Sequence, residues 1–286
     1  MERIVYLNGE YVKETEAQVS IFDRGFLFAD AVYEVTAVID GKLVDNDGHM
    51  QRLQRSCSEL QIALPITIEE ITAAQRALVE KNKMVEGAIY LQISRGNAGD
   101  RDFGYPDASV KPTLVLFTQA RNVIESPKAI TGMKVVTIED IRWKRRDIKT
   151  VGLLAPCMAK QASHDQNVDD AWLVEDGYIT EGSSNNAYIV TQEGVLVTRP
   201  LSNDILHGIT RKALLELAKQ EDIVIEERLF TPEEARQAKE AFISSATTFV
   251  LAVVEIDGVT IADGKPGAVA NKLREIYIDL AKKTAE

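Results

Sequence analysis

The stretch Ile141-Arg142-Trp143-Lys144-Arg145-Arg146-Asp147-Ile148-Lys149-Thr150 places five cationic residues within eight positions. Apolar residues flank it, with Val135-Val136 upstream and Val151 and Leu154 downstream. A lysine in such a run is ordinarily a solvated surface residue. A lysine that instead points into a site is desolvated or set beside other cations, and both conditions favour its neutral amine. Because a neutral amine attacks carbonyl groups and forms Schiff bases, Lys149 is the first candidate catalytic residue.

Length and composition restrict the class of protein. The chain has 286 residues, of which 45% are hydrophobic, so it can bury a full core as one large or two medium domains. The formal net charge of −11 speaks against nucleic-acid binding, which needs a basic surface. We expect small-molecule partners instead.

The cysteines and histidines indicate neither a disulfide framework nor a metal site. Cys57 and Cys157 lie in apolar helical contexts without metal-ligand spacing, which suits a reducing cytoplasm. The histidines His49, His164 and His207 are too scattered for a metal cluster, and we predict no metal. The sequence has neither an N-terminal signal pattern nor 18 consecutive apolar residues, so we expect a cytoplasmic protein without a membrane span.

Turn dipeptides and hydrophobic periodicity predict a mixture of strands and helices. Asn8-Gly9, Asp40-Gly41 and Asp257-Gly258 are typical of hairpin turns. Thr67 and Glu70 form a capping-box pattern at the start of a helix. We expect helices over about 49–60, 67–83, 153–166, 209–220 and 267–283, and strands near 32–39, 88–94, 113–118, 133–138, 171–174, 187–191, 195–198, 223–228 and 241–244.

The chain is expected to form two α/β domains of an α+β-like kind. Polar residues without periodicity over 119–127 indicate a linker between an N-terminal domain, 1–118, and a C-terminal domain, 128–286, which carries Lys149. The lack of a steady β-α alternation argues against a doubly wound sheet. The segment from Arg95 to Lys111 is too long for a neutral connection and is a candidate functional loop.

Two further motifs suggest a binding site. Thr180-Glu181-Gly182-Ser183-Ser184-Asn185-Asn186-Ala187-Tyr188 is a small-residue turn with a carboxylate at its head, placed between two predicted strands. Leu206-His207-Gly208-Ile209-Thr210-Arg211 is a glycine turn that runs into a helix, and free N–H groups at a helix start bind phosphate. A solvated turn and a plain helix start explain the same residues. Together with Lys149, however, they are the parts of a pyridoxal 5'-phosphate site.

The spacing of these motifs resembles the signature of the class-IV, fold-type-IV aminotransferases. The resemblance covers Glu-x-Ser-x-x-Asn from Glu181, Tyr188, Leu196-x-Thr198 and Leu206-x-Gly208-Ile209-x-Arg211. Within that family the chain looks most like D-amino-acid transaminases, and the stretches that carry this likeness are Asp23-Arg24-Gly25, Val32-Tyr33-Glu34-Val35, His49-Met50-Gln51-Arg52-Leu53, Asp140-Ile141-Arg142-Trp143 and Asp147-Ile148-Lys149.

The resemblance implies a two-domain homodimer with pyridoxal 5'-phosphate as cofactor. It implies that Lys149 forms the Schiff base and moves the proton, that Glu181 contacts the pyridine nitrogen, and that Arg52 binds the phosphate with a charge-assisted fork. It further implies cofactor contacts from Leu206, Ile209, Thr210, Ser245, Ala246 and Thr247, and substrate contacts from Tyr33, Arg101 and Thr247. Outside the family context, Arg52 is a solvated helix residue and Tyr33 a core aromatic.

One departure from the family pattern bears on the substrate. D-amino-acid transaminases of the best-known type carry Arg-x-His on the long loop, whereas this loop has Asp100-Arg101-Asp102-Phe103. We expect amino-group transfer between D-amino acids, such as D-alanine or D-glutamate, and α-keto acids such as 2-oxoglutarate or pyruvate, with tolerance for (R)-amines. The alternatives are an (R)-amine transaminase, a branched-chain L-amino-acid aminotransferase, an aminodeoxychorismate lyase and a cofactor- or ligand-binding sensor.

Overall fold

The computed structural model describes residues 2–286, which divide into two compact units. The first unit contains the chain up to Asn122 with Ile148–Gly152 and Ala281–Glu286, and the second contains Val123–Asp147 and Leu153–Leu280.

The position of the Lys149 segment differs from the expected domain division. The change of unit after Asn122 falls inside the predicted linker, 119–127. We expected Lys149 in the C-terminal domain, whereas residues 148–152 pack with the first unit. The reason is backbone pairing, because Thr150 bridges to Val32 and the Lys149 carbonyl accepts the Tyr33 N–H at 2.9 Å.

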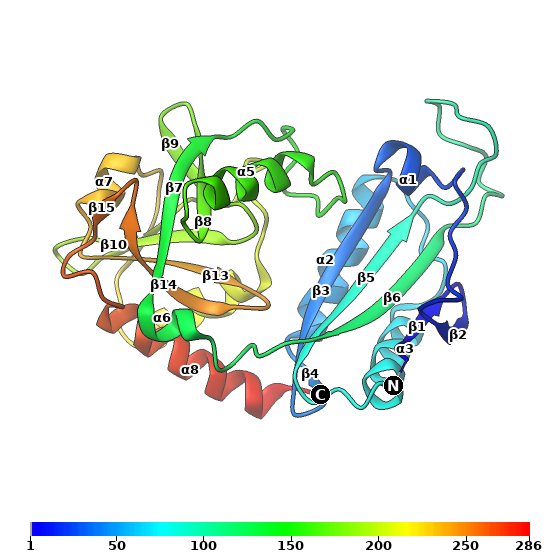
Figure 1. The fold of residues 1–286 in the computed structure, drawn as a ribbon, viewed down its shortest axis with the longest axis horizontal. Helices are drawn as coiled ribbons and strands as arrows, with labels where there is room; N and C mark the ends of the chain where they lie inside the picture. The colour runs from blue at the N-terminus through cyan, green and yellow to red at the C-terminus, as the bar shows by residue number, and fades with distance from the viewer. Residues whose placement is uncertain (1) are drawn as a thin grey trace. The chain divides into compact units, whose positions relative to one another are not determined.

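The first unit is built on a six-stranded antiparallel sheet in the order β2-β1-β6-β5-β3-β4 (Figure 1). Its strands are β1 (Ile4–Leu7), β2 (Glu10–Lys13), β3 (Ala31–Ile39), β4 (Lys42–Leu43), β5 (Gly87–Ser94) and β6 (Thr113–Ala120). The predicted turn at Asn8-Gly9 joins β1 to β2, and the one at Asp40-Gly41 joins β3 to β4. All four residues have positive φ, as type I′ turns require.

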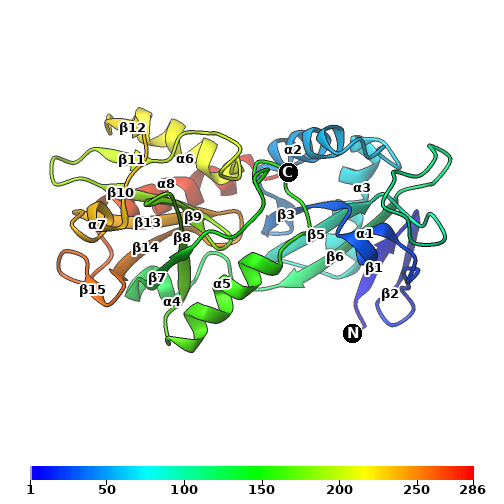
Figure 2. The same ribbon diagram turned by 90° about the horizontal axis from the view of Figure 1, so that it is seen from above.

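Two helices, α2 (Asn46–Glu59) and α3 (Ile68–Lys81), cover one face of this sheet (Figures 1 and 2). Their apolar residues, such as Leu53 and Leu78, share one core with Val32 and Ile89 of the sheet. The predicted capping box at the start of α3 is confirmed. The segment Asp23-Arg24-Gly25 opens a short helix, α1 (Arg24–Phe28), at whose start the Asp23 side chain accepts the Gly25 N–H.

The second unit is built on a mixed nine-stranded sheet with the order β12-β11-β10-β13-β14-β7-β8-β9, and β15 pairs with β14. The strands are β7 (Met133–Glu139), β8 (Asp170–Glu175), β9 (Tyr178–Gly182), β10 (Asn186–Val190), β11 (Leu196–Thr198), β12 (Ile225–Glu227), β13 (Glu240–Ser245), β14 (Phe249–Ile256) and β15 (Val259–Thr260). The mixture of parallel and antiparallel pairs confirms that this is not a doubly wound sheet.

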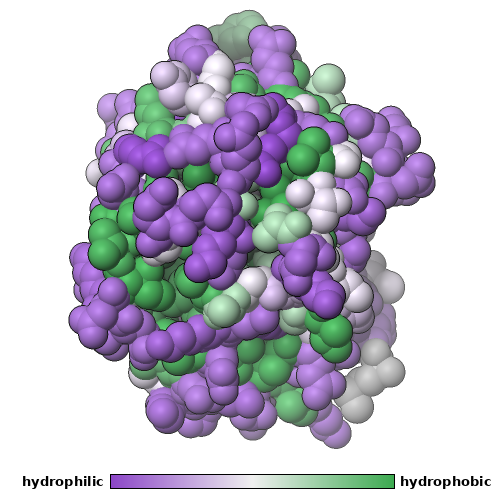
Figure 3. All heavy atoms as spheres, turned by 90° about the vertical axis from the view of Figure 1, so that its left-hand side faces the viewer, coloured by the Kyte–Doolittle hydropathy of each residue, from purple (hydrophilic) through white to green (hydrophobic). Residues whose placement is uncertain are grey.

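Alternation along the strands gives the second unit a core on each face of its sheet. On β10, Ile189 belongs to one cluster, while Tyr188 faces the other, which includes Leu214 and Leu273. The helices of this unit are α4 (Pro127–Thr131), α5 (Leu154–Asp165), α6 (Ile209–Gln220), α7 (Pro232–Arg236) and α8 (Ala268–Thr284), whose last residues belong to the first unit. Seen from the left-hand side of Figure 1, hydrophilic residues cover most of the visible surface (Figure 3).

No helix within residues 2–286 combines the length and the hydrophobicity needed to cross a bilayer.

Candidate active site

Lys149 differs from the other cations of the basic run in having no carboxylate partner among residues 2–286. Arg142 pairs with Asp140 and Glu181, Lys144 and Arg146 pair with Glu175, and Arg145 pairs with Asp147. The run is therefore not a uniform basic surface. Four of its five cations are held in ion pairs, and the half-buried Lys149 keeps an unpaired amine.

Tyr33 on β3 lies beside that amine. The Lys149 Nζ atom is 4.1 Å from the centre of the Tyr33 ring, and the backbone N–H of Lys149 points to Ser56 Oγ at 3.4 Å. Strand β3 fixes the geometry, because the Tyr33 N–H also donates to the Lys149 carbonyl. The amine thus rests on an aromatic face, where a cation is attracted but no acid neutralises it.

Arg52 forms its charge-assisted fork within the first unit. Its Nε and Nη2 atoms donate to the two oxygens of Glu34 at 2.7 and 2.8 Å, and His49 Nδ1 lies 2.8 Å from the same carboxylate. All three side chains are buried. We expected the fork to hold a phosphate, but this fork is made to Glu34, which fixes the guanidinium.

The Glu34 carboxylate should make stability fall in acid. Burial alone raises the pKa of Glu34, but the charge and hydrogen bonds of Arg52 and those of His49 outweigh burial and lower this pKa from 4.5 to about 2. A depressed pKa gives stability that is complete above pH 4.5 and lost as the pH falls towards 2. We expect this carboxylate to account for about 3 kcal/mol of the loss in unfolding free energy.

Denaturant unfolding of the wild type and a Glu34→Gln variant between pH 2 and pH 6 measures that loss. The variant is less stable at neutral pH because it leaves Arg52 without its anion, but it should lack this part of the acid-dependent decrease. Parallel pH profiles of the two proteins would contradict the assignment.

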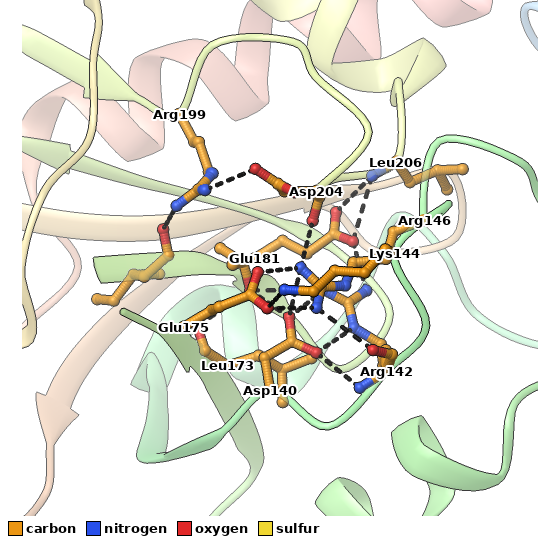
Figure 4. Close-up of polar contacts among 12 residues, drawn as sticks. Asp140, Arg142, Lys144, Arg146, Leu173, Glu175, Glu181, Arg199, Asp204 and Leu206 are labelled. Atoms are coloured by element: carbon orange, nitrogen blue, oxygen red, sulfur yellow. Dashed lines mark hydrogen bonds and ion pairs between the residues drawn. The ribbon is translucent and has the colours of Figure 1, made fainter. Parts of the chain in front are cut away.

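Glu181 is a buried acid of the second unit (Figure 4). It lies on β9, one residue before the turn that begins after Gly182, rather than at the head of the turn as expected. Arg142 Nη1 donates to its Oε1 at 2.6 Å, Asn186 Nδ2 donates to its Oε2 at 3.0 Å, and the Leu206 N–H donates to both oxygens. The carboxylate is therefore fixed in position from three sides.

Arg142 favours the ionised form of the buried Glu181 carboxylate. Burial raises the pKa of Glu181, and the charge and hydrogen bond of Arg142 oppose that rise without cancelling it. Asp140 holds Arg142 by two bonds, at 2.9 and 2.7 Å. Sequence analysis assigns no separate role to Arg142, because its partner Glu181 lies 39 positions away.

The start of α6 offers the N–H groups that the sequence predicted. Gly208 occupies the N-cap position without a side-chain cap, and Thr210 in the first turn is buried. A Cβ atom at Gly208 would lie 2.1 Å from Oδ1 of Asn186, the residue that also binds Glu181, so this position requires glycine. A helix start without a side-chain cap leaves its N–H groups to a ligand anion.

The turn over residues 245–248 connects β13 to β14. Ser245 Oγ lies 2.7 Å from Thr248 Oγ1, and Ala246 and Thr247 form the tip. Phe249 ends the turn with φ of 56°, a strained conformation for a large side chain, and its ring packs 5.2 Å from Tyr277. The Ser245–Thr248 contact and the packing of Phe249 on Tyr277 thus fix the backbone of this turn at both of its ends.

Arg101 lies exposed on the long loop of the first unit. Its guanidinium carbon is 4.9 Å from the Phe28 ring and 4.7 Å from the Phe103 ring, and these rings are 5.5 Å apart. Arg24 anchors the loop by donating to the carbonyls of Asp102 and Gly104. No carboxylate among residues 2–286 pairs with Arg101, so its charge is available to an anion.

Comparisons with known proteins now identify the family. Residues 31–256 match the family described as amino-transferase class IV. The chain is a class IV aminotransferase. It is 38% identical to a D-alanine aminotransferase of Staphylococcus haemolyticus, with 95% of each chain covered, and 39% identical to that of Staphylococcus aureus strain MW2, with 96% of each covered.

Solved structures of class IV aminotransferases share the fold. The branched-chain amino acid aminotransferase of Escherichia coli matches with a TM-score of 0.89 at 23% identity, covering 100% of this chain and 97% of that one. That of Thermoproteus uzoniensis with norvaline matches with a TM-score of 0.85 at 25% identity, over 98% and 95% of the two chains. The predicted two-domain, fold-type-IV architecture is confirmed.

Enzymes of this class use pyridoxal 5'-phosphate, and the residues present fit that cofactor. Within the second unit, the uncapped start of α6 suits the phosphate and the buried carboxylate of Glu181 suits the ring nitrogen. Within the first unit, Lys149 carries an unpaired amine of the kind that attacks an aldehyde. The chain is a pyridoxal-phosphate-dependent aminotransferase.

Proposed function

We propose that the enzyme transfers the amino group between D-amino acids and α-keto acids. The observation that carries this proposal is the identity to D-alanine aminotransferases over nearly the full length of both chains. The likeness to branched-chain enzymes is structural and comes with lower identity, so it supports the fold and not an L-amino-acid substrate. D-Alanine and D-glutamate are the proposed donors, and pyruvate and 2-oxoglutarate the acceptors.

We assign the proton transfer to Lys149. The bound cofactor supplies an aldehyde that takes up the amino group and a ring that accepts electrons during proton transfer. With the cofactor bound, Nζ of Lys149 would hold its aldehyde, and the free amine would carry the proton to and from the α-carbon of the substrate. Its unpaired state and its position against the Tyr33 ring support this role. Tyr33 is assigned to the substrate pocket.

We assign the second-unit residues to holding the cofactor. With the cofactor bound, Glu181, which Arg142 fixes, would keep a proton on the ring nitrogen, and Leu206 would pack against the ring. The phosphate would be held by the N–H groups of Ile209 and Thr210 and by the turn residues Ser245, Ala246 and Thr247. Thr247 would also contact the substrate. We further assign Arg52, whose Nε and Nη2 atoms donate to Glu34, to the phosphate of the cofactor.

We assign the substrate carboxylate to Arg101 and infer that the enzyme is a cytoplasmic homodimer in which this arginine serves the neighbouring subunit. The unpaired charge of Arg101 and the anchored loop support the assignment. Sedimentation equilibrium measures the assembly, and the affinity of an Arg101→Ala variant for a simple carboxylate tests the contact. An unchanged affinity would reassign the carboxylate site.

The absorption spectrum of the holoenzyme tests the proposed function. We expect a visible cofactor band that bleaches on addition of D-alanine, because the amino group moves to the cofactor. Samples with L-leucine and with an (R)-amine run in parallel. Bleaching by L-leucine or the amine alone would move the substrate to one of the alternatives, and no band after reconstitution with pyridoxal 5'-phosphate would favour a protein without this activity.

A further inference from the structure

Arg146 is a buried arginine that the function described above does not use. It lies in the basic run three residues before Lys149, and only 1% of its side chain is exposed. Its Nε atom has no hydrogen-bond partner, although a buried donor without one costs free energy. The orientation of this guanidinium is therefore set by the contacts of its two other nitrogens.

The strongest of these contacts is a two-bond pair with Glu175 at the end of β8 (Figure 4). Arg146 Nη1 donates to Glu175 Oε2 at 2.7 Å, and Nη2 donates to Oε1 at 3.2 Å. The hydrogen bonds from Arg146 come first among the causes that lower the pKa of Glu175 to about 2. Exposed Lys144 contacts the same carboxylate, so Glu175 connects the buried arginine to the surface.

Arg146 also holds the loop that leads from β11 into α6. Its backbone N–H donates to the Asn203 carbonyl at 2.9 Å, and Nη1 lies 3.5 Å from the Asp204 carbonyl. Two residues further along, the Leu206 N–H donates to both oxygens of Glu181. A displacement of this loop would therefore remove a donor from Glu181.

A second route from Arg146 reaches the same carboxylate. Nη1 of Arg146 lies 3.6 Å from Asp140 Oδ2, and Nη2 lies 3.4 Å from the carbonyl oxygen of Arg142. Asp140 in turn holds the guanidinium of Arg142, which donates to Glu181 at 2.6 Å. Charges alternate along the chain Glu175, Arg146, Asp140, Arg142 and Glu181, so each member is attracted to the next.

We propose that Arg146, paired with Glu175, is a positioning residue for Glu181. It fixes the positions of the loop that carries Leu206 and of the Arg142 guanidinium, so that both can donate hydrogen bonds to the Glu181 carboxylate. This inference rests on the proposed contact of Glu181 with the cofactor. It assigns to the sequence between Arg142 and Lys149 a second function besides carrying the lysine.

The experiment compares the wild type with Arg146→Met, Arg146→Lys and Glu175→Gln. The readouts are the Kd for pyridoxal 5'-phosphate and the pH midpoint of the cofactor's absorption change, with the Tm of the cofactor-free protein. We expect Arg146→Met and Glu175→Gln each to raise the Kd by about ten-fold and to shift the midpoint. Their effects should not add in the double variant, and Arg146→Lys should restore part of the affinity.

Arg236→Met is the control, because Arg236 pairs with Asp257 through one contact in the same unit, outside this network. We expect it to lower the Tm and leave the Kd and the midpoint unchanged. If Arg146→Met and Glu175→Gln also lower the Tm and leave the Kd and the midpoint unchanged, Arg146 has only a structural role and the proposal is overturned. If Arg146→Met does not fold, Glu175→Gln decides alone. A wild type that binds no cofactor would instead overturn the proposed function.

Discussion

Replacement of Lys149 by alanine should lower kcat for the transfer from D-alanine to 2-oxoglutarate by about 10³-fold or more, with little loss of stability. The large effect on activity follows because the variant lacks the amine to which the proposed function assigns both cofactor attachment and proton transfer. The small effect on stability follows because Nζ makes no ion pair and rests only on the Tyr33 ring. Steady-state kinetics and thermal unfolding measure the two quantities.

Lys134→Ala is the matched control for that variant. Lys134 is half exposed and pairs with Glu255, so its loss removes a lysine charge at a distance in sequence from every proposed site residue. The control should keep wild-type kcat. A Lys149→Ala enzyme that turns over at more than a tenth of the wild-type rate would remove this lysine from the chemistry, and partial rescue by small added amines would strengthen its role as base.

The secondary structure was largely accessible from the sequence because its signals are local. The helix predicted over 209–220 is α6, with the same ends, and the capping box at Thr67 marks the start of α3. The predicted hairpin turn at Asp257-Gly258 has positive φ at both residues. Each of these features depends on residues within four positions of one another.

The contacts of the site were not accessible in the same way, because they join distant positions. Glu181 binds an arginine 39 positions earlier, and Arg146 binds Glu175 across 29 positions. Nothing local distinguishes Arg146 from exposed Lys144 two residues before it. The placement of Lys149 with the first unit has the same cause, since a bridge between Val32 and Thr150 decides it.

Family resemblance supplied residues, but the structure changes how one of them can act. Arg52 was expected to direct its fork at a phosphate, and the structure directs that fork at Glu34. The sequence did not predict this pair, because Glu34 follows Tyr33 in a predicted strand, where an acidic residue is ordinary and does not indicate a buried partner for Arg52. The buried pair makes Arg52 rigid, and a rigid cation loses less entropy when it binds an anion.

Replacement of Glu181 by glutamine should lower kcat by about 100-fold and weaken cofactor binding. An amide keeps the size of the side chain and an acceptor for the Leu206 N–H, but it carries no charge to hold a proton on the ring nitrogen. Arg142 retains Asp140, so the loss in unfolding free energy should stay below the roughly 3–5 kcal/mol typical of a buried charge left without any partner. Kinetics with D-alanine, cofactor titration and denaturant unfolding measure the three effects.

Glu240→Gln is the control that separates the specific effect of losing the Glu181 charge from the general effect of losing a buried carboxylate in this unit. Glu240 is also buried in the second unit, where it accepts the N–H groups of Val269 and Ala270 at the start of α8. Its replacement should cost stability, because a helix start loses its anion, and should leave kcat and cofactor affinity unchanged. If Glu240→Gln and Glu181→Gln reduce activity equally, the effect belongs to the stability of the unit, and the ring nitrogen must find its counter-charge elsewhere.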